Sequence, residues 1–182
     1  LNIEKVSNDN YTQLYSLEST SPIIRNTSVL ENLLEFSGSR DDFDLNISFE
    51  TYESMNKLNS DKYEFIYPNY SLTKDVKLEN AYFNNIELSS SGNQKKFNTN
   101  VYEGVQVNDL LFSNDDTISK FGFKNNFSGI FKNVNSDGKN SSKFKDKAQS
   151  ELLTMLTYDA SLPLIKKGNK YTNLLTPRLS LR

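Results

Sequence analysis

The feature that most constrains this chain is a strict alternation of apolar and polar side chains over residues 43–50. The apolar members are Phe43, Leu45, Ile47 and Phe49, and the polar members are Asp44, Asn46, Ser48 and Glu50. Successive side chains of a strand point to opposite faces of its sheet, whereas a helix would require a period near 3.6. The stretch therefore predicts a strand with one apolar and one polar face.

Similar alternation recurs along most of the chain and predicts an all-β fold. The other clear patterns lie at 97–112, 121–132 and 149–164, and weaker ones lie at 11–18, 29–36, 63–73, 81–90 and 171–181. Turn signals rich in Gly, Asn, Asp and Ser lie between them, at 37–42, 56–61, 91–93, 113–116, 135–138 and 167–169. About nine strands result, and helix signals are nearly absent.

The length of these strands separates the candidate architectures. Several patterns run well past the roughly 5–6 residues that are usual in globular proteins. Membrane barrels instead use long tilted strands, with an apolar face toward lipid and a polar face toward an aqueous lumen. We therefore expect residues 1–182 to form part of a single outer-membrane β-barrel domain, an antiparallel arc of a larger barrel. A soluble β-sandwich, with its Phe and Tyr residues in a dry core, is the alternative.

Composition excludes several classes of function. The chain has no His and no Cys, so thiolate and imidazole chemistry and the usual zinc ligands are absent, and we expect neither an enzyme nor a cofactor. Its 21 basic and 23 acidic residues are scattered, which argues against nucleic acid as a partner. The pairs Asp41-Asp42 and Asp115-Asp116 could bind Ca²⁺, but acidic pairs in turns usually only solubilise loops.

Two stretches carry a more specific signal. Near the end, SLPLI at 161–165 is followed by a short polar turn and by TNLLTPRLSL at 172–181; earlier, TYESMN at 51–56 is followed by DKYEFIYPNY at 61–70. Their order and spacing resemble the barrel of the LptD (OstA/Imp) family of lipopolysaccharide-assembly proteins. The positions that match the family's motifs are Tyr63, Pro68, Pro163, Leu164, Pro177 and Arg178.

This resemblance implies a role in transport without bond chemistry. In that family, an outer-membrane β-barrel inserts lipopolysaccharide into the outer leaflet of the Gram-negative outer membrane. The implied partners are lipopolysaccharide, outer-membrane lipid, an LptE-like lipoprotein plug and a periplasmic lipopolysaccharide-bridge protein that binds through an N-terminal domain. We expect neither that N-terminal jellyroll domain nor a signal peptide within these residues, and the cysteines that form a disulfide in some members are missing.

The alternation assigns residues to the two sides of the expected wall. The candidates for the lumen are Asp44, Asn46, Ser48, Asn98, Asn100, Lys124 and Asn126, and those for the lipid side are Phe43, Leu45, Phe49, Phe121, Phe123 and Leu156. Polar residues in the lumen would hydrate the passage of sugars or contact the plug. The alternative for them is a solvated strand face without a ligand. Pro68 and Pro163 are expected at strand ends or bulges, since proline removes a hydrogen-bond donor.

Two other classes of protein fit the same patterns. A porin or other outer-membrane channel would share the alternation, but it usually has a constricting loop with clustered charges, which this sequence lacks. A soluble β-sandwich for binding or adhesion would need shorter strands and an enclosed apolar core.

Overall fold

The described part of the chain is built from strands alone. The computed structural model describes residues 1–8, 10, 28–57, 62–79 and 83–182, and no helix occurs among them. The strands are β1 (Val29–Arg40), β2 (Phe43–Ser54), β3 (Tyr63–Lys77), β4 (Asn85–Phe97), β5 (Tyr102–Ser113), β6 (Thr117–Ile118), β7 (Lys124–Lys139), β8 (Gln149–Ser161), β9 (Leu164–Lys167), β10 (Thr172–Leu175) and β11 (Arg178–Leu181). The all-β prediction is therefore confirmed. Among the described residues, no helix is both apolar and long enough to span a membrane.

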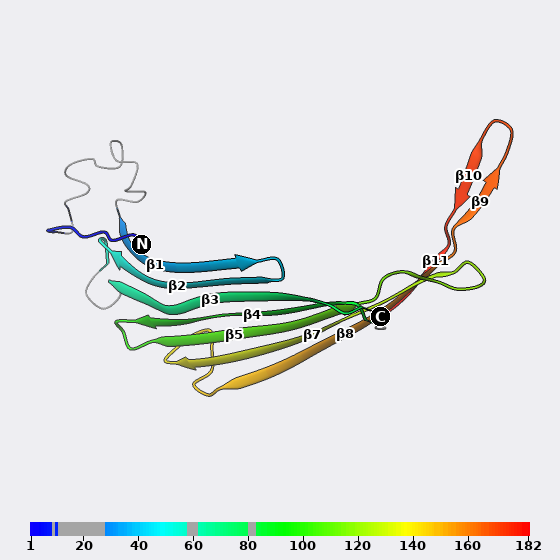
Figure 1. Ribbon diagram of the computed structural model, residues 1–182. Coiled ribbons are helices and arrows are strands. Elements are labelled where there is room, and N and C mark those ends of the chain that lie inside the picture. Colours follow the sequence, from blue (N-terminus) through cyan, green and yellow to red (C-terminus); the bar gives the residue numbers. More distant parts are fainter. Residues whose placement is uncertain (9, 11–27, 58–61, 80–82) are drawn as a thin grey trace. The chain divides into compact units, whose positions relative to one another are not determined.

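From β1 to β5, strands that follow one another in sequence also lie side by side (Figure 1). A nine-stranded antiparallel sheet has the order β1-β2-β3-β4-β5-β7-β8-β11, with the short β6 paired to β7. β9 and β10 form a separate two-stranded sheet. The sheet path ends at β1 and at β11, so the sheet formed by the described strands is open.

The chain divides into two compact units. Unit 1 contains Leu1–Leu72, Ser90–Val107 and Val134–Glu151, and unit 2 contains Thr73–Ser89, Asn108–Asn133 and Leu152–Arg182. Each unit therefore draws its strands from several distant stretches of sequence.

In unit 1, the pairing of β1 with β2 separates apolar from polar residues. Leu34 lies opposite Phe49 and Phe36 lies opposite Ile47, while Glu35 lies opposite Ser48 and Ser37 opposite Asn46. Residues directly opposite in an antiparallel pair have their side chains on the same face. The hairpin thus has one apolar and one polar face, as the alternation at 43–50 predicts.

Few apolar side chains are buried in the described residues. Leu30, Met55 and Ile66 are at most 7% exposed. Phe36 in unit 1 is 58% exposed, and Phe121 in unit 2 is 86% exposed. An apolar side chain left in water forgoes about 1.5–3 kcal/mol of burial free energy. The sheet is therefore held together mainly by its backbone ladder and by contacts across strands.

One predicted strand begins too early, and the turn predicted before it is wrong. β4 continues through the expected turn at 91–93 and ends at Phe97; Asn98 and Asn100, predicted on a strand of 97–112, lie in the turn to β5. Asn100 has a φ of 60°, which asparagine tolerates better than most residues, and its N–H donates to the Phe97 carbonyl over 3.1 Å. Gly92 lies within β4 and not in a turn. Its lack of a side chain is needed there because the β5 backbone is so close that a Cβ would lie 2.6 Å from the Val105 carbonyl oxygen.

Other boundaries also differ from the predictions. Phe121 and Phe123 lie in the β6–β7 turn instead of on a strand, because Gly122 has a φ of 82° and its N–H donates to the Ser119 carbonyl. The turn expected at 135–138 lies within β7, where Gly138 is buried against Phe144. The turn expected at 37–42 shrinks to residues 41–42.

The structure agrees only in part with the remaining predicted segments. The strand at 171–181 is divided into β10 and β11 around Pro177, which lacks the N–H that would continue a ladder. Pro163 lies between β8 and β9, as expected, whereas Pro68 lies within β3 after a cis peptide bond with Tyr67. The strand predicted at 11–18 lies outside the described residues, as do 58–61 of the turn at 56–61 and 81–82 of the strand at 81–90.

The close approach at Gly92 generates a test with a matched control. Replacing Gly92 with Ala places a Cβ against backbone, which cannot move without disturbing the β4–β5 ladder, and should lower the free energy of unfolding by about 1–3 kcal/mol. Gly38→Ala on β1, where a Cβ meets nothing within 4 Å, should change it by no more than about 0.5 kcal/mol. Urea titration of both variants in the folded, detergent-solubilised full-length protein makes the comparison, and equal stabilities would contradict the described β4–β5 contact.

Candidate functional site

The polar face of the β1–β2 hairpin in unit 1 carries a hydrogen-bonded network centred on Glu50. The carboxylate of Glu50 accepts from the Ser48 hydroxyl over 2.6 Å, from the Tyr52 hydroxyl over 2.9 Å and from the Asn69 amide over 3.0 Å. Ser48 is only 7% exposed, so its hydroxyl depends on this partner. The network links β2 to β3 and keeps the buried polar groups satisfied.

Toward the tip of the hairpin, the same face continues with more exposed pairs. The Asn46 amide donates to Glu35 over 2.9 Å, and the Ser39 hydroxyl donates to Asp44 over 2.5 Å. These contacts join β1 to β2 across the face. Asp44, Asn46 and Ser48, which the sequence assigns to one polar side, are therefore brought together as predicted.

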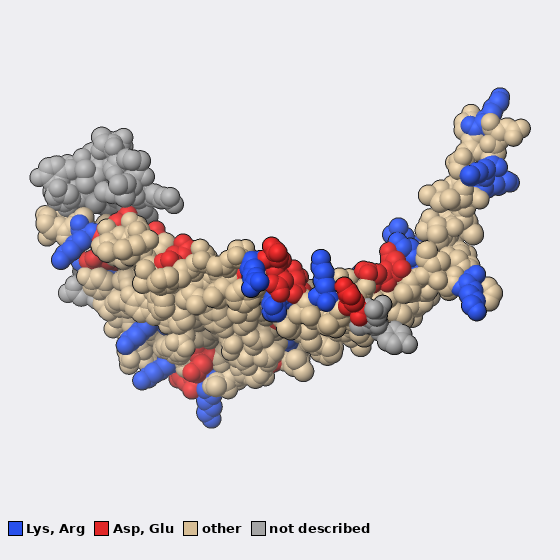
Figure 2. Space-filling view, in the orientation of Figure 1, with Lys and Arg blue, Asp and Glu red and all other residues tan. Residues whose placement is uncertain are grey.

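The other face of the same strands is apolar and open. Leu34 is 38% exposed and Phe49 is 37% exposed. Phe49 begins a row of aromatic rings, which consists of Phe49, Tyr67, Phe65 and Tyr63 with neighbouring ring centroids 5.9–6.1 Å apart. The Tyr67 hydroxyl is hydrogen-bonded to Thr51. Figure 2 shows a broad area with few charged side chains on the sheet face in view, bordered by Lys, Arg, Asp and Glu.

Unit 2 repeats the separation of apolar from polar side chains on β7. On one face, Phe112 stacks on Phe131 with centroids 5.8 Å apart, and Phe127 lies 4.6 Å from Tyr158. The Phe112 ring lies over Gly129, where a Cβ would come within 2.3 Å of it. Phe127 is 48% exposed, so this aromatic face is also open.

The alternate residues of β7 make polar contacts. The Lys132 ammonium lies 2.8 Å from Asp109, the Lys124 ammonium lies 2.5 Å from Asp116, and the Asn126 amide donates to the Asn114 carbonyl over 2.9 Å. Lys124 and Asn126 thus lie on the polar side of their strand, as predicted. Asn98 and Asn100 do not, because they lie in the β4–β5 turn.

The residues assigned to the lipid side have mixed outcomes. Phe43, Leu45 and Phe49 alternate on the apolar face of β2. Leu156 of β8 is 58% exposed. Phe121 and Phe123 are exposed, but they lie in a turn instead of a strand face. The error has one source: a Phe-Gly-Phe sequence has the apolar spacing of a strand and the glycine of a turn.

The positions that match the family motifs lie at strand ends and connections, except Pro68, which lies within β3. In unit 2, Leu164 opens β9 opposite Leu175, and Arg178 opens β11 opposite Ser161. The Pro177 carbonyl accepts from the Leu162 N–H over 3.0 Å. In unit 1, Tyr63 opens β3 and donates to Glu53 over 2.9 Å. The strand, turn and strand expected from 161–181 are present, with an additional break at Pro177.

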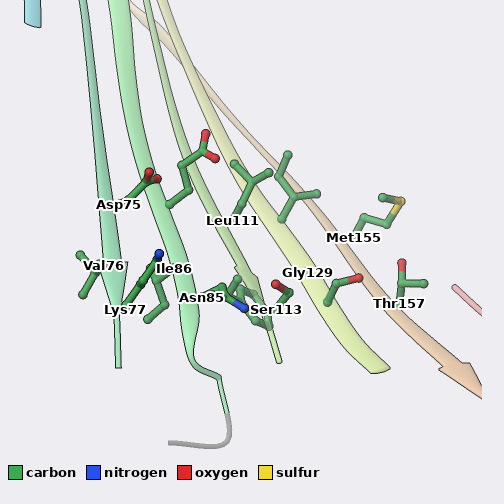
Figure 3. Close-up of a pocket in the computed structure, with 14 residues that line it drawn as sticks. Asp75, Val76, Lys77, Asn85, Ile86, Leu111, Ser113, Gly129, Met155 and Thr157 are labelled. Atoms are coloured by element: carbon green, nitrogen blue, oxygen red, sulfur yellow. The ribbon is translucent and has the colours of Figure 1, made fainter. Parts of the chain in front are cut away.

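A groove of about 500 Å³ in unit 2 was not foreseen from the sequence (Figure 3). It is lined by short segments of β3, β4, β5, β7 and β8, including Asp75, Lys77, Leu111, Met155 and Thr157. No sequence signal could reveal it, because five strands contribute only two or three residues each. Its residues include no His or Cys, so it offers a mixed apolar and polar surface without nucleophilic thiol or imidazole chemistry.

Of the two acidic pairs considered for Ca²⁺, the pair at 115–116 is engaged by neighbouring side chains. Asp115 accepts from the Asn85 amide over 3.1 Å, and Asp116 forms the ion pair with Lys124. In the described residues, no group of three or more His, Cys, Asp or Glu side chains could hold a metal ion. These contacts give the acidic pair at 115–116 a structural role in the connection between β5 and β7.

Comparison with protein-family models and with curated proteins gives no match for this chain.

The Glu50 network generates a second test. Glu50→Ala removes the acceptor of buried Ser48 and the nearer of the two acceptors of Tyr52, and should lower the free energy of unfolding by about 1–3 kcal/mol. Glu35→Ala, which removes an exposed contact on the same face, should cost about 0.5 kcal/mol or less. Urea titration of both variants in the folded, detergent-solubilised full-length protein compares their stabilities, and a larger loss for Glu35→Ala would show that the polar face is not organised around Glu50.

Proposed function

We propose that this chain forms part of the wall of an outer-membrane β-barrel that transports lipopolysaccharide to the outer leaflet. The observation that carries the proposal is the division of long strands into an exposed apolar face and a hydrogen-bonded polar face. In a membrane, the apolar face would meet lipid chains and the polar face a hydrated lumen.

Strand length supports a wall that spans the membrane. A tilted strand needs about 9–11 residues to cross the hydrocarbon core. β1, β2 and β5 contain 12 residues each, and β7 contains 16. Exposed apolar side chains such as Phe36 and Phe49, costly in water, are stabilised in lipid.

A soluble β-sandwich accounts less well for the same strands. It would bury Phe36 and Phe49 under a second sheet. These side chains are 58% and 37% exposed among the described residues. A membrane wall requires no second layer, because lipid covers that face.

An open arc needs further strands to become a barrel. Unpaired backbone groups in hydrocarbon cost several kcal/mol each. The edge of β11, and the part of the β1 edge that lies beyond its bridge between Leu33 and Asn2, would therefore be paired by strands outside the described residues. We expect the 182 residues expressed alone to aggregate for the same reason.

The assignment to lipopolysaccharide rests on the resemblance at 51–70 and 161–181. Lipopolysaccharide is an amphiphile, so its sugars require a hydrated path while its acyl chains enter the membrane. Asp44, Asn46 and Ser48 would line that path or contact an LptE-like lipoprotein plug. The periplasmic bridge protein would bind elsewhere in the full-length protein.

Cysteine accessibility tests the two-faced wall, since these residues contain no native cysteine. Single cysteines at Glu35, Asn46, Phe36 and Ile47 would be placed in the full-length protein in its native membrane. Those at Glu35 and Asn46 should react with a hydrophilic maleimide at least about tenfold faster than those at Phe36 and Ile47, because thiolates form readily only where water reaches the thiol. Equal rates at all four positions would contradict the membrane wall.

Photo-crosslinking tests the transported molecule separately. A photoreactive amino acid at Asn46 in growing cells should form an adduct with lipopolysaccharide, detected by an antibody against its sugar, because the polar face would line the sugar path. The same group at Phe36 should react mainly with membrane phospholipid. If the maleimide rates alternate between the two faces but neither Asn46 nor Glu35 gives an adduct with lipopolysaccharide, the result would favour another outer-membrane channel.

A further inference from the structure

The β9–β10 hairpin in unit 2 has apolar side chains on both of its faces. Leu164 lies opposite Leu175 on one face, and Ile165 lies opposite Leu174 on the other. The four side chains are 46–66% exposed. β9 and β10 pair only with each other in the described sheets, and the turn between them is closed by the Gly168 N–H, which donates to the Tyr171 carbonyl over 2.9 Å.

The charge of this segment differs in sign from that of the rest of the chain. From Ala160 to the last residue there are five basic and no acidic residues, whereas the preceding 159 residues hold 16 basic and 23 acidic ones. Lys166, Lys167 and Lys170 surround the tip of the hairpin. Figure 2 shows Lys or Arg atoms, and no Asp or Glu atoms, on the face of the hairpin in view.

These two properties together specify the chemistry of the partner. A flat protein surface would cover one face of a two-stranded ribbon and leave the other in water, whereas a lipid layer surrounds both faces. Lysines beside apolar side chains match anionic headgroups that lie above acyl chains. Tyr171, at 76% exposure, adds an aromatic side chain of the kind that favours the headgroup level.

We propose that the β9–β10 hairpin docks into an anionic lipid layer, with Leu164, Ile165, Leu174 and Leu175 among the acyl chains and Lys166, Lys167 and Lys170 at the phosphates. This contact does not require that the long strands form a barrel or that the protein transports lipopolysaccharide. The hairpin would bind the lipid layer in either case.

The chain contains no tryptophan, so Leu174→Trp supplies a single fluorescent reporter. The 182-residue chain, which we expect to aggregate without detergent, is held in uncharged maltoside micelles. It is titrated with phosphatidylglycerol, with phosphatidylcholine or with glycerol phosphate as the free headgroup. Phosphatidylglycerol should shift the Trp emission to the blue at a lipid fraction at least about tenfold lower than phosphatidylcholine, because each lysine adds attraction to the anionic headgroups. Glycerol phosphate should produce no shift.

Charge removal identifies the residues responsible. In the reporter chain, Lys166→Gln, Lys167→Gln and Lys170→Gln together should abolish the preference for phosphatidylglycerol. The matched control carries Lys143→Gln, Lys145→Gln and Lys147→Gln, at three exposed lysines in the connection between β7 and β8. This control should retain the preference for phosphatidylglycerol. Circular dichroism of both variants would verify equal strand content.

Several results would overturn the proposal. These are equal responses to the two lipids, an unchanged preference after the three hairpin substitutions, and an equal loss of preference in the control. A blue shift that grows with protein concentration without phosphatidylglycerol would assign the hairpin to contacts between copies of the chain instead.

Discussion

The antiparallel backbone ladder is the interaction on which the described structure depends. With few buried apolar side chains, the strands cannot be held by a packed core of ordinary size. Each strand instead satisfies its N–H and C=O groups through its neighbours, and a strand at an edge leaves half of them unpaired. Side-chain contacts such as the Glu50 network and the aromatic row add to a ladder that already fixes which residues share a face.

Local alternation made much of this sheet predictable. β2 and β8 were recognised because alternation continues along them, and the pairing of Leu34 with Phe49 places the apolar residues together. The polar contacts of Asp44, Asn46 and Ser48 follow from the same period. Prediction succeeded where the two faces of a strand differ clearly in polarity.

The errors arose where the structure depends on a neighbouring strand. The sequence around Gly92 and Gly138 predicts turns, but each glycine lies within a strand, Gly92 against Val105 and Gly138 against Phe144. Conversely, the Asn98–Asn100 turn interrupts a pattern that continues on either side of it. The groove in unit 2 was missed since its lining is assembled from five strands. A single sequence does not reveal such contacts.

The two-residue turn between β1 and β2 has a consequence for how this hairpin can change in length. Only Asp41 and Asp42 connect Arg40 to its partner Phe43, so the turn has no extra residue that could absorb a shift in register. One residue inserted in the middle of β1 would turn every side chain beyond it to the opposite face. Phe36 would then lie on the polar face, which carries the carboxylates. Insertions of two residues would preserve the faces, so this hairpin tolerates even changes in strand length far better than odd ones.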